Sequence, residues 1–123
     1  MITEDYVSFE TAKLLKERGF NKDTYTMSMY DENGEAKDVL LLKVGEEPVL
    51  RPTLQMTMKW LREVHSLYID IVTSFSQDGI CYTFSCSNTM DLIQGTKGTS
   101  YHEYQTYEEA AEAAVLYCLQ NLI

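Results

Sequence analysis

Residues 53–86 read TLQMTMKWLREVHSLYIDIVTSFSQDGICYTFSC, and this stretch contains the change of hydrophobic period that decides the fold. In its first part, apolar side chains recur at helical spacing. The face that they form consists of Leu54, Met58, Leu61 and Val64. Thr53 precedes them as an N-cap, because its hydroxyl can accept a hydrogen bond from the first turn. The pattern predicts an amphipathic helix over residues 53–66.

The second part of the stretch alternates with the period of two that is typical of strands. We predict strands at Tyr68–Phe75 and Ile80–Cys86, joined by a turn at residues 77–79 that ends in Gly79. The candidates for core-facing side chains are Ile69, Ile71 and Phe75, or Tyr82 and Phe84. The two strands are expected to pair as an antiparallel hairpin.

A helix is also predicted upstream, from Phe9 to Arg18. Ser8 is its N-cap, and Gly19 ends it by adopting the left-handed conformation. Phe20 then stands where a Schellman ending makes its apolar contact, here with Leu15.

A second hairpin is predicted between the two helices. TYTMSMY at residues 24–30 alternates as a strand, and a turn over residues 31–36 contains Asn33 and Gly34, which tolerate positive φ. The returning strand is Asp38–Val44. GEEPVLRP, which follows it, contains two prolines and a glycine and is predicted to be a connector.

The C-terminal part is predicted to be a loop, a short strand and a helix. Residues 87–98 show no clear period and are rich in small polar residues, so we predict a loop, followed by a strand at Ser100–Tyr104. The last helix starts after Thr106, which forms a capping box with Glu109. Its packed stripe is predicted to be Ala110, Ala114, Cys118 and Leu122.

These elements predict an α+β fold in the order α-β-β-α-β-β-β-α. The strands are mostly antiparallel, and the amphipathic helices pack on the sheet as a two-layer sandwich. A chain of 123 residues is of the size of one domain, so we predict a single domain over residues 1–123, with candidate sub-lobes at residues 1–47 and 51–123.

The charge and the cysteines restrict the classes of partner and the compartment. The formal net charge of −9 repels nucleic acid and anionic lipid headgroups, so neither is an expected partner. No apolar run reaches the roughly 20 residues that a membrane helix needs. The N-terminal MITEDYVSFE lacks the pattern of an export signal, and three cysteines without a CxxC pair fit reduced thiols. We therefore predict a cytoplasmic protein.

The sequence contains no recognisable catalytic group of residues. The two histidines, His65 and His102, are expected at a helix end, near its last carbonyls, and on an exposed strand position, respectively. Cys81 and Cys86 must face opposite sides of one strand, and buried inert thiols are their expected state. We predict no catalytic residue, no metal site and no cofactor, and the sequence favours a protein that is not an enzyme.

Surface recognition is the role that the sequence favours instead. Nine tyrosines and one tryptophan supply aromatic area, although core packing is the expected role of Trp60. The acidic residues near the last helix suit its N-terminal end. The candidate interaction residues are Trp60, Arg62, His65, Tyr101, Tyr104, Glu108, Glu109 and Glu112.

Two resemblances add to this interpretation. The order of the elements after residue 50 and the alanine-rich last helix resemble a double-stranded RNA-binding domain, but Glu108, Glu109 and Glu112 stand where that family has lysines that meet phosphate. The resemblance therefore implies the fold and not the activity. Three segments, TEDYVSFETAKLLKERGF, RPTLQMTMKWLREVH and YEEAAEAAVLYCLQNLI, resemble a family of small uncharacterised proteins from gut Bacteroides and their phages and prophages. That resemblance implies a bacterial or phage cytoplasmic setting and no site residue.

The leading hypothesis is a small non-enzymatic protein-interaction or accessory module that binds another protein through an acidic, tyrosine-rich surface. One alternative is a small-molecule binder or enzyme with a pocket between the helix at residues 53–66 and the loop at residues 87–98. Another is an acidic mimic of nucleic acid. A homodimer is also compatible with a sheet that leaves one edge open.

Overall fold

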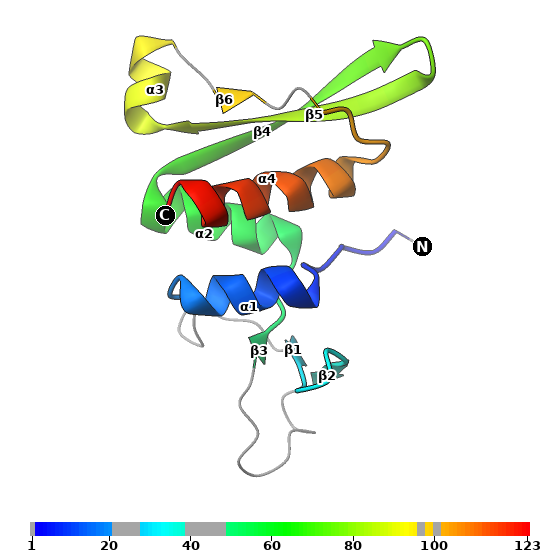
Figure 1. The fold of residues 1–123 in the computed structure, drawn as a ribbon, viewed down its shortest axis with the longest axis vertical. Helices are drawn as coiled ribbons and strands as arrows, with labels where there is room; N and C mark the ends of the chain where they lie inside the picture. Colours follow the sequence, from blue (N-terminus) through cyan, green and yellow to red (C-terminus); the bar gives the residue numbers. More distant parts are fainter. Residues whose placement is uncertain (1, 21–27, 39–48, 96–97, 100–101) are drawn as a thin grey trace. The chain divides into compact units, whose positions relative to one another are not determined.

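The computed structural model describes residues 2–20, 28–38, 49–95, 98–99 and 102–123. The elements follow the order α1-β1-β2-β3-α2-β4-β5-α3-β6-α4, and the described strand pairs are antiparallel (Figure 1). The predicted α+β class with mostly antiparallel strands is confirmed. The chain divides into two compact units, unit 1 (Met1–Met56) and unit 2 (Thr57–Ile123).

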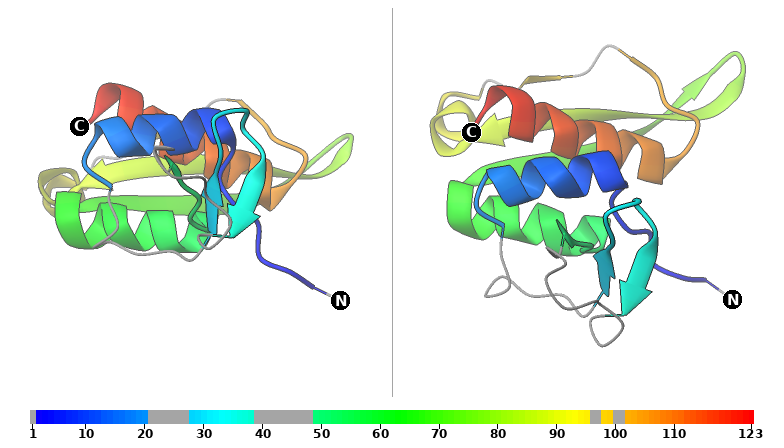
Figure 2. Two further views of the ribbon diagram at one scale, coloured as in Figure 1. Left: turned by 90° about the horizontal axis from the view of Figure 1, so that it is seen from below. Right: turned by 60° about the horizontal axis from the view of Figure 1, so that its bottom comes forward.

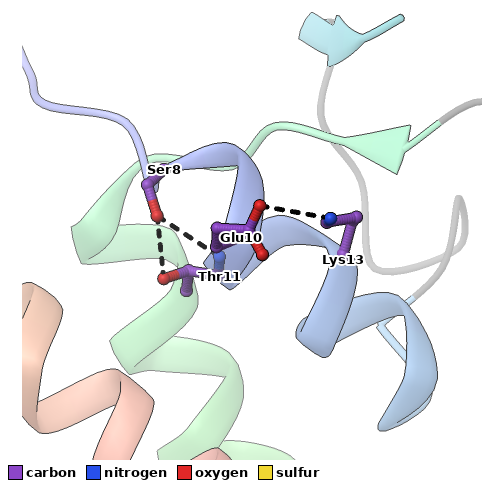
Figure 3. Close-up of polar contacts among 4 residues, drawn as sticks. All are labelled: Ser8, Glu10, Thr11 and Lys13. Carbon is purple, nitrogen blue, oxygen red and sulfur yellow. Dashed lines mark hydrogen bonds and ion pairs between the residues drawn. The ribbon is translucent and has the colours of Figure 1, made fainter. Parts of the chain in front are cut away.

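Helix α1 (Phe9–Glu17) starts at the predicted cap. Ser8 Oγ accepts a hydrogen bond from the N–H of Thr11 at 3.3 Å and donates one to Thr11 Oγ1 at 3.1 Å (Figure 3). Glu10 and Lys13 form an ion pair at 3.2 Å in the same region (Figure 3). Both of these side chains are largely exposed, so the capping bonds of Ser8 contribute more to the start of the helix than the ion pair does.

The end of α1 also follows the prediction. Gly19 has a φ of 98°, and the N–H of Phe20 bonds to the carbonyl of Leu15 at 3.0 Å. This is the long hydrogen bond of a Schellman ending. Phe20 and Leu15 are both buried, so the turn that stops the helix also places an apolar side chain in the core.

Unit 1 contains a small sheet of strand order β2-β1-β3. β1 (Ser28–Tyr30) confirms the end of the strand predicted at residues 24–30, whose first part lies outside the described residues. β2 (Ala36–Asp38) begins before the predicted Asp38, and residues 39–44 of that prediction also lie outside the described part of the chain.

The third strand of this sheet, β3 (Val49–Leu50), was predicted as part of a connector, and that prediction was wrong. Val49 and Leu50 pair with Tyr30 and Met29 of β1. Two apolar residues between prolines are too few to show a period, but their backbone can still complete a sheet. Pro52 follows outside the ladder, and its carbonyl accepts a hydrogen bond from Val7 at 3.0 Å.

Helix α2 (Leu54–His65) spans the boundary between the units. Leu54, Met58 and Leu61 are buried as predicted. Val64 was predicted on the same buried face but is exposed, because it lies in the last turn of the helix.

The main feature of unit 2 is the hairpin of β4 (Leu67–Ser76) and β5 (Gly79–Asn88). Both strands were predicted, and each is longer than expected. Their register pairs Ser76 with Gly79 at the turn. Helix α4 (Tyr107–Asn121) packs on both strands.

The prediction of a loop at residues 87–98 was wrong over most of its length. Ser87 and Asn88 continue β5, and α3 (Thr89–Gln94) follows directly. Asn88 Oδ1 accepts from the N–H of Asp91 at 2.8 Å, while Asp91 Oδ2 accepts from the N–H of Asn88 at 3.1 Å. This reciprocal capping box starts a helix that is too short to show a period.

Of the strand predicted at Ser100–Tyr104, the described residues 102–104 do not form a continuous strand. β6 (Gly98–Thr99) lies earlier in the chain and pairs with β5, and Tyr104 forms a single antiparallel bridge with Tyr82. Residues 100–101 lie outside the described part.

Thr106 is the N-cap of α4 and accepts from the N–H of Glu109 at 3.1 Å, which is one of the two hydrogen bonds of the predicted capping box. The buried side chains of α4 are Ala110, Ala111, Ala114, Val115, Cys118 and Leu119. Leu122 was predicted in this stripe but is exposed, because it follows the last helical residue. In the described parts of the chain, no helix combines the length and the apolar character required to cross a bilayer.

Candidate functional site

Trp60, Arg62 and His65 lie on α2 but differ in exposure. Trp60 is 5% exposed, and its ring meets the His65 ring edge-on at a centroid distance of 4.7 Å. Arg62 is exposed. The core role expected for Trp60 is therefore confirmed. Nε2 of His65 is buried and has no hydrogen-bond partner in the described part of the chain, and the ring lies edge-on against Trp60.

A second aromatic group lies between β5 and the segment before α4. Tyr104 is half-buried, and its ring lies 6.3 Å from Phe84 and 4.6 Å from His102. His102 is exposed, as predicted. Tyr101 lies outside the described residues. The backbone bridge to Tyr82 fixes Tyr104 on the face of the sheet that α4 covers, so its ring belongs mainly to the packing of unit 2.

The predicted acidic residues lie at the start of α4. Glu108 and Glu109 are exposed in the first turn, where the helix dipole favours negative charge, and Glu112 is half-buried one turn later. The predicted site residues thus belong to three separate elements: α2, the segment before α4, and α4 itself. Among these residues the structure brings together Trp60 and His65, and Tyr104 contacts His102, which was not a candidate.

The sequence did not indicate that Cys86 on β5 and Cys118 on α4 would meet. Their Sγ atoms are 3.6 Å apart, and both residues are buried. The Cys86 thiol also approaches the carbonyl of Ala114 at 3.9 Å. The contact with Cys118 is the larger cause that raises the pKa of the Cys86 thiol, and burial is the second. Both thiols are buried in the contact between β5 and α4, which fits a packing role.

We find no candidate metal site among the residues that the structure describes. No group of three or more histidine, cysteine, aspartate or glutamate side chains in these residues is arranged to hold an ion.

The main candidate binding surface in unit 2 is the side of β4 that faces away from β5. The sheet order is β4-β5-β6, so within the described chain only one side of β4 has a neighbouring strand. The N–H and C=O of Tyr82 bond to Tyr104 at 2.8 Å each. Tyr82 therefore does not use these groups toward its β4 partner Thr73, and Thr73 must direct its own N–H and C=O to the other side.

The same alternation applies along the whole strand, because hydrogen-bonded and non-hydrogen-bonded pairs alternate in an antiparallel ladder. The residues whose backbone groups point away from β5 are Leu67, Ile69, Ile71, Thr73 and Phe75, which we call the β4 outer edge. A row of such groups is a template for another strand. Natural edges are commonly protected by charges or prolines, but β4 contains no proline and a single charged residue, Asp70.

Apolar side chains accompany this edge. Phe75 and Ile80 form the last pair but one before the hairpin turn and are 81% and 56% exposed. We call them the tip pair. They lie on the face that α4 covers further along the strands, but the turn extends beyond the first turn of α4 (Figure 2). The core position predicted for Phe75 was therefore wrong, because the covering helix is too short to reach it.

Two further apolar groups are exposed in unit 2. Val72, on the other face of β4, is 44% exposed. Helix α3 buries none of its residues and exposes Met90, Leu92 and Ile93. Because α3 follows the far end of β5, its apolar surface is separated from the tip pair by the length of the hairpin (Figure 1).

No direct signal in the sequence marks the β4 outer edge, because an edge strand is defined by the order of strands in the sheet. The nearly uncharged composition of residues 67–88 was the only readable sign. No protein-family model, curated protein or solved structure matches the chain, so its function is inferred from the geometry of these surfaces.

Proposed function

We propose that the chain is a non-enzymatic protein-interaction module that binds an extended protein segment along the β4 outer edge. The observation that carries this proposal is the row of backbone N–H and C=O groups that β4 directs away from β5. An added strand would satisfy these groups with its own backbone, and side chains of alternate residues would provide the specificity.

The side chains beside the edge support the same role. The exposed Phe75 adds apolar area next to the backbone groups, and aromatic residues contribute strongly to protein interfaces. Asp70 is the one charged position along the edge. We therefore expect the bound segment to be mainly apolar, with a polar or basic residue opposite Asp70.

The test is affinity capture from a lysate of the source organism, with the tagged wild type and the variant Thr73→Pro. Proline at this position removes an N–H that points outward, whereas the β4–β5 ladder does not use it. We expect the bound protein to be lost or reduced at least tenfold, while circular dichroism stays unchanged.

The matched control is Thr73→Val, which keeps the N–H and suits a strand. It should capture as much as the wild type. Equal capture by the folded Thr73→Pro variant would contradict the proposal, and so would a wild type that retains no protein chain of any kind, a second copy of itself included.

A further inference from the structure

We infer that the strand added to the β4 outer edge is β4 of a second copy, paired antiparallel about a two-fold axis at Val72. This inference rests on the proposed function and names its partner. The unit 2 sheets of the two copies would form one continuous sheet with both β4 strands at its centre. The β4 edge of each copy would then be paired.

The direction of the backbone groups restricts the register of such a pair. Outward-directed residues of one strand must oppose outward-directed residues of the other, and these are the odd-numbered residues of β4. A two-fold axis must then pass through a residue and not between two residues. An axis at Asp70 would place like charges directly opposite each other, which is unfavourable.

An axis at Val72 gives each position a suitable partner. Val72 faces Val72 of the second copy, so an exposed apolar side chain on each chain becomes covered. Asp70 faces Ser74 of the second copy, whose hydroxyl can donate to the carboxylate. Like charges are kept apart along the whole of β4, because it has only this one charged residue.

The same register also covers the most exposed side chain of the edge. Phe75, which is 81% exposed, lies opposite Ile69 of the second copy. Aromatic and β-branched residues are a favourable cross-strand pair. Ile71 and Thr73 oppose each other on either side of the axis, and together these pairs use the outward N–H and C=O groups from Ile69 to Phe75.

The geometry makes a distance prediction for engineered cysteines. Val72 uses its backbone groups toward β5, so the Val72 pair across the axis is a non-hydrogen-bonded pair with Cα atoms about 4.5 Å apart. That separation suits a disulfide. The two copies of Asp70, which is exposed on the same face of β4, are offset by four residues in this register and lie roughly 13 Å apart.

The experiment compares Val72→Cys with the control Asp70→Cys under a mild disulfide oxidant, with the mass in solution measured by light scattering over a concentration series. We expect the wild type to reach twice the chain mass of 14.2 kDa. Val72→Cys should give a covalent dimer on a non-reducing gel at least tenfold faster than Asp70→Cys. Val72→Lys, which places two ammonium groups at the axis on an exposed position, should stay folded and monomeric.

A wild type that keeps the mass of one chain at every concentration would overturn the inference, as would equal cross-linking of the two cysteine variants. The same measurements distinguish failure of this inference from failure of the proposed function. A monomeric wild type that captures a different protein, with the capture lost in Thr73→Pro, rejects the second copy as the partner and retains the β4 outer edge as a binding surface.

Discussion

The sheets of unit 1 and unit 2 both contain three described strands, but they are stabilised in different ways. In unit 1 the described parts of the strands are two or three residues long, and each borders residues outside the described part of the chain. β4 and β5 have ten residues each and are covered by α4.

Polar side chains make several of the described contacts in unit 1. The Arg51 guanidinium lies 3.7 Å from the centroid of the Tyr6 ring, and its Nη1 donates to Ser28 Oγ at 2.9 Å. The Tyr30 hydroxyl donates to the carbonyl of Val7. In the β1–β2 turn, Asp31 accepts from two backbone N–H groups.

The comparison shows why the candidate surface belongs to unit 2. In unit 2 the long ladder with β5 and the cover of α4 stabilise β4 from one side and one face, and no described strand lies on its other side. In unit 1, polar side chains bind the strands to the flanking segments. The predictions below test this division, from the largest expected effect to the smallest.

The largest effect is expected where α4 covers the hairpin. Phe84 is buried between the rings of Tyr104 and Tyr117, at centroid distances of 6.3 and 6.1 Å. Phe84→Ala should lower the free energy of unfolding by about 3–5 kcal/mol. Denaturant titration followed by the fluorescence of Trp60, which lies in the same unit, measures this change.

Phe75→Ala is the matched control, because it makes the same substitution on the same face beyond the reach of α4. It should cost less than about 1 kcal/mol. Similar costs for the two variants would show that the tip is packed as tightly as the centre of the hairpin, contrary to this account.

An intermediate effect is expected in unit 1. Arg51→Met removes the cation–π contact with Tyr6 and the hydrogen bond to Ser28, so it should cost about 1–2 kcal/mol. Arg51→Lys keeps the charge and should recover part of this loss. Denaturant titration followed by the NMR signal of the buried Met29 methyl group reports on this unit, and an Arg51→Met variant as stable as the wild type would refute the role of Arg51.

A smaller, pH-dependent effect is expected in the β1–β2 turn. The N–H of Glu35 lowers the pKa of the Asp31 carboxyl, and Lys37 and the N–H of Asn33 add to this against the opposing effect of burial. Because the folded-state pKa is below the unfolded value, ionised Asp31 stabilises the fold at neutral pH, and this contribution is lost as the pH falls through the lowered pKa.

Asp31→Asn should therefore differ most from the wild type at neutral pH and approach it in stability at acid pH. NMR titration of the Asp31 carboxyl gives the direct measurement. A midpoint at or above that of an ordinary exposed aspartate would contradict the turn geometry.

Most of the fold could be predicted from local signals. The caps at Ser8 and Thr106, the Gly19 ending and the period change at residues 53–86 gave α1, α2, α4 and the β4–β5 hairpin. β3 and β6 were missed because their two described residues are too few to show a period. α3 was missed although its capping box, Asn88 and Asp91, is readable in the sequence.

The candidate site was less predictable because it depends on tertiary arrangement. Phe75 carries the alternation of a core residue, and only the length and position of α4 leave it exposed. Cys86 on β5 and Cys118 on α4 are distant in the sequence, so their contact depends on the tertiary fold. Of the predicted interaction residues, Trp60 is buried, while Arg62, Glu108 and Glu109 are exposed on helices and lie outside the β4 outer edge.

The most direct test of the β4 outer edge is amide hydrogen exchange, measured residue by residue in the wild type and in Val72→Lys. At concentrations where the wild type pairs, the amides of Ile69, Ile71, Thr73 and Phe75 should be as protected as the intervening amides that bond to β5. In Val72→Lys, protection should alternate along β4, with these four amides exchanging fast. Fast exchange at the four positions in both proteins, or slow exchange in both, would contradict the account.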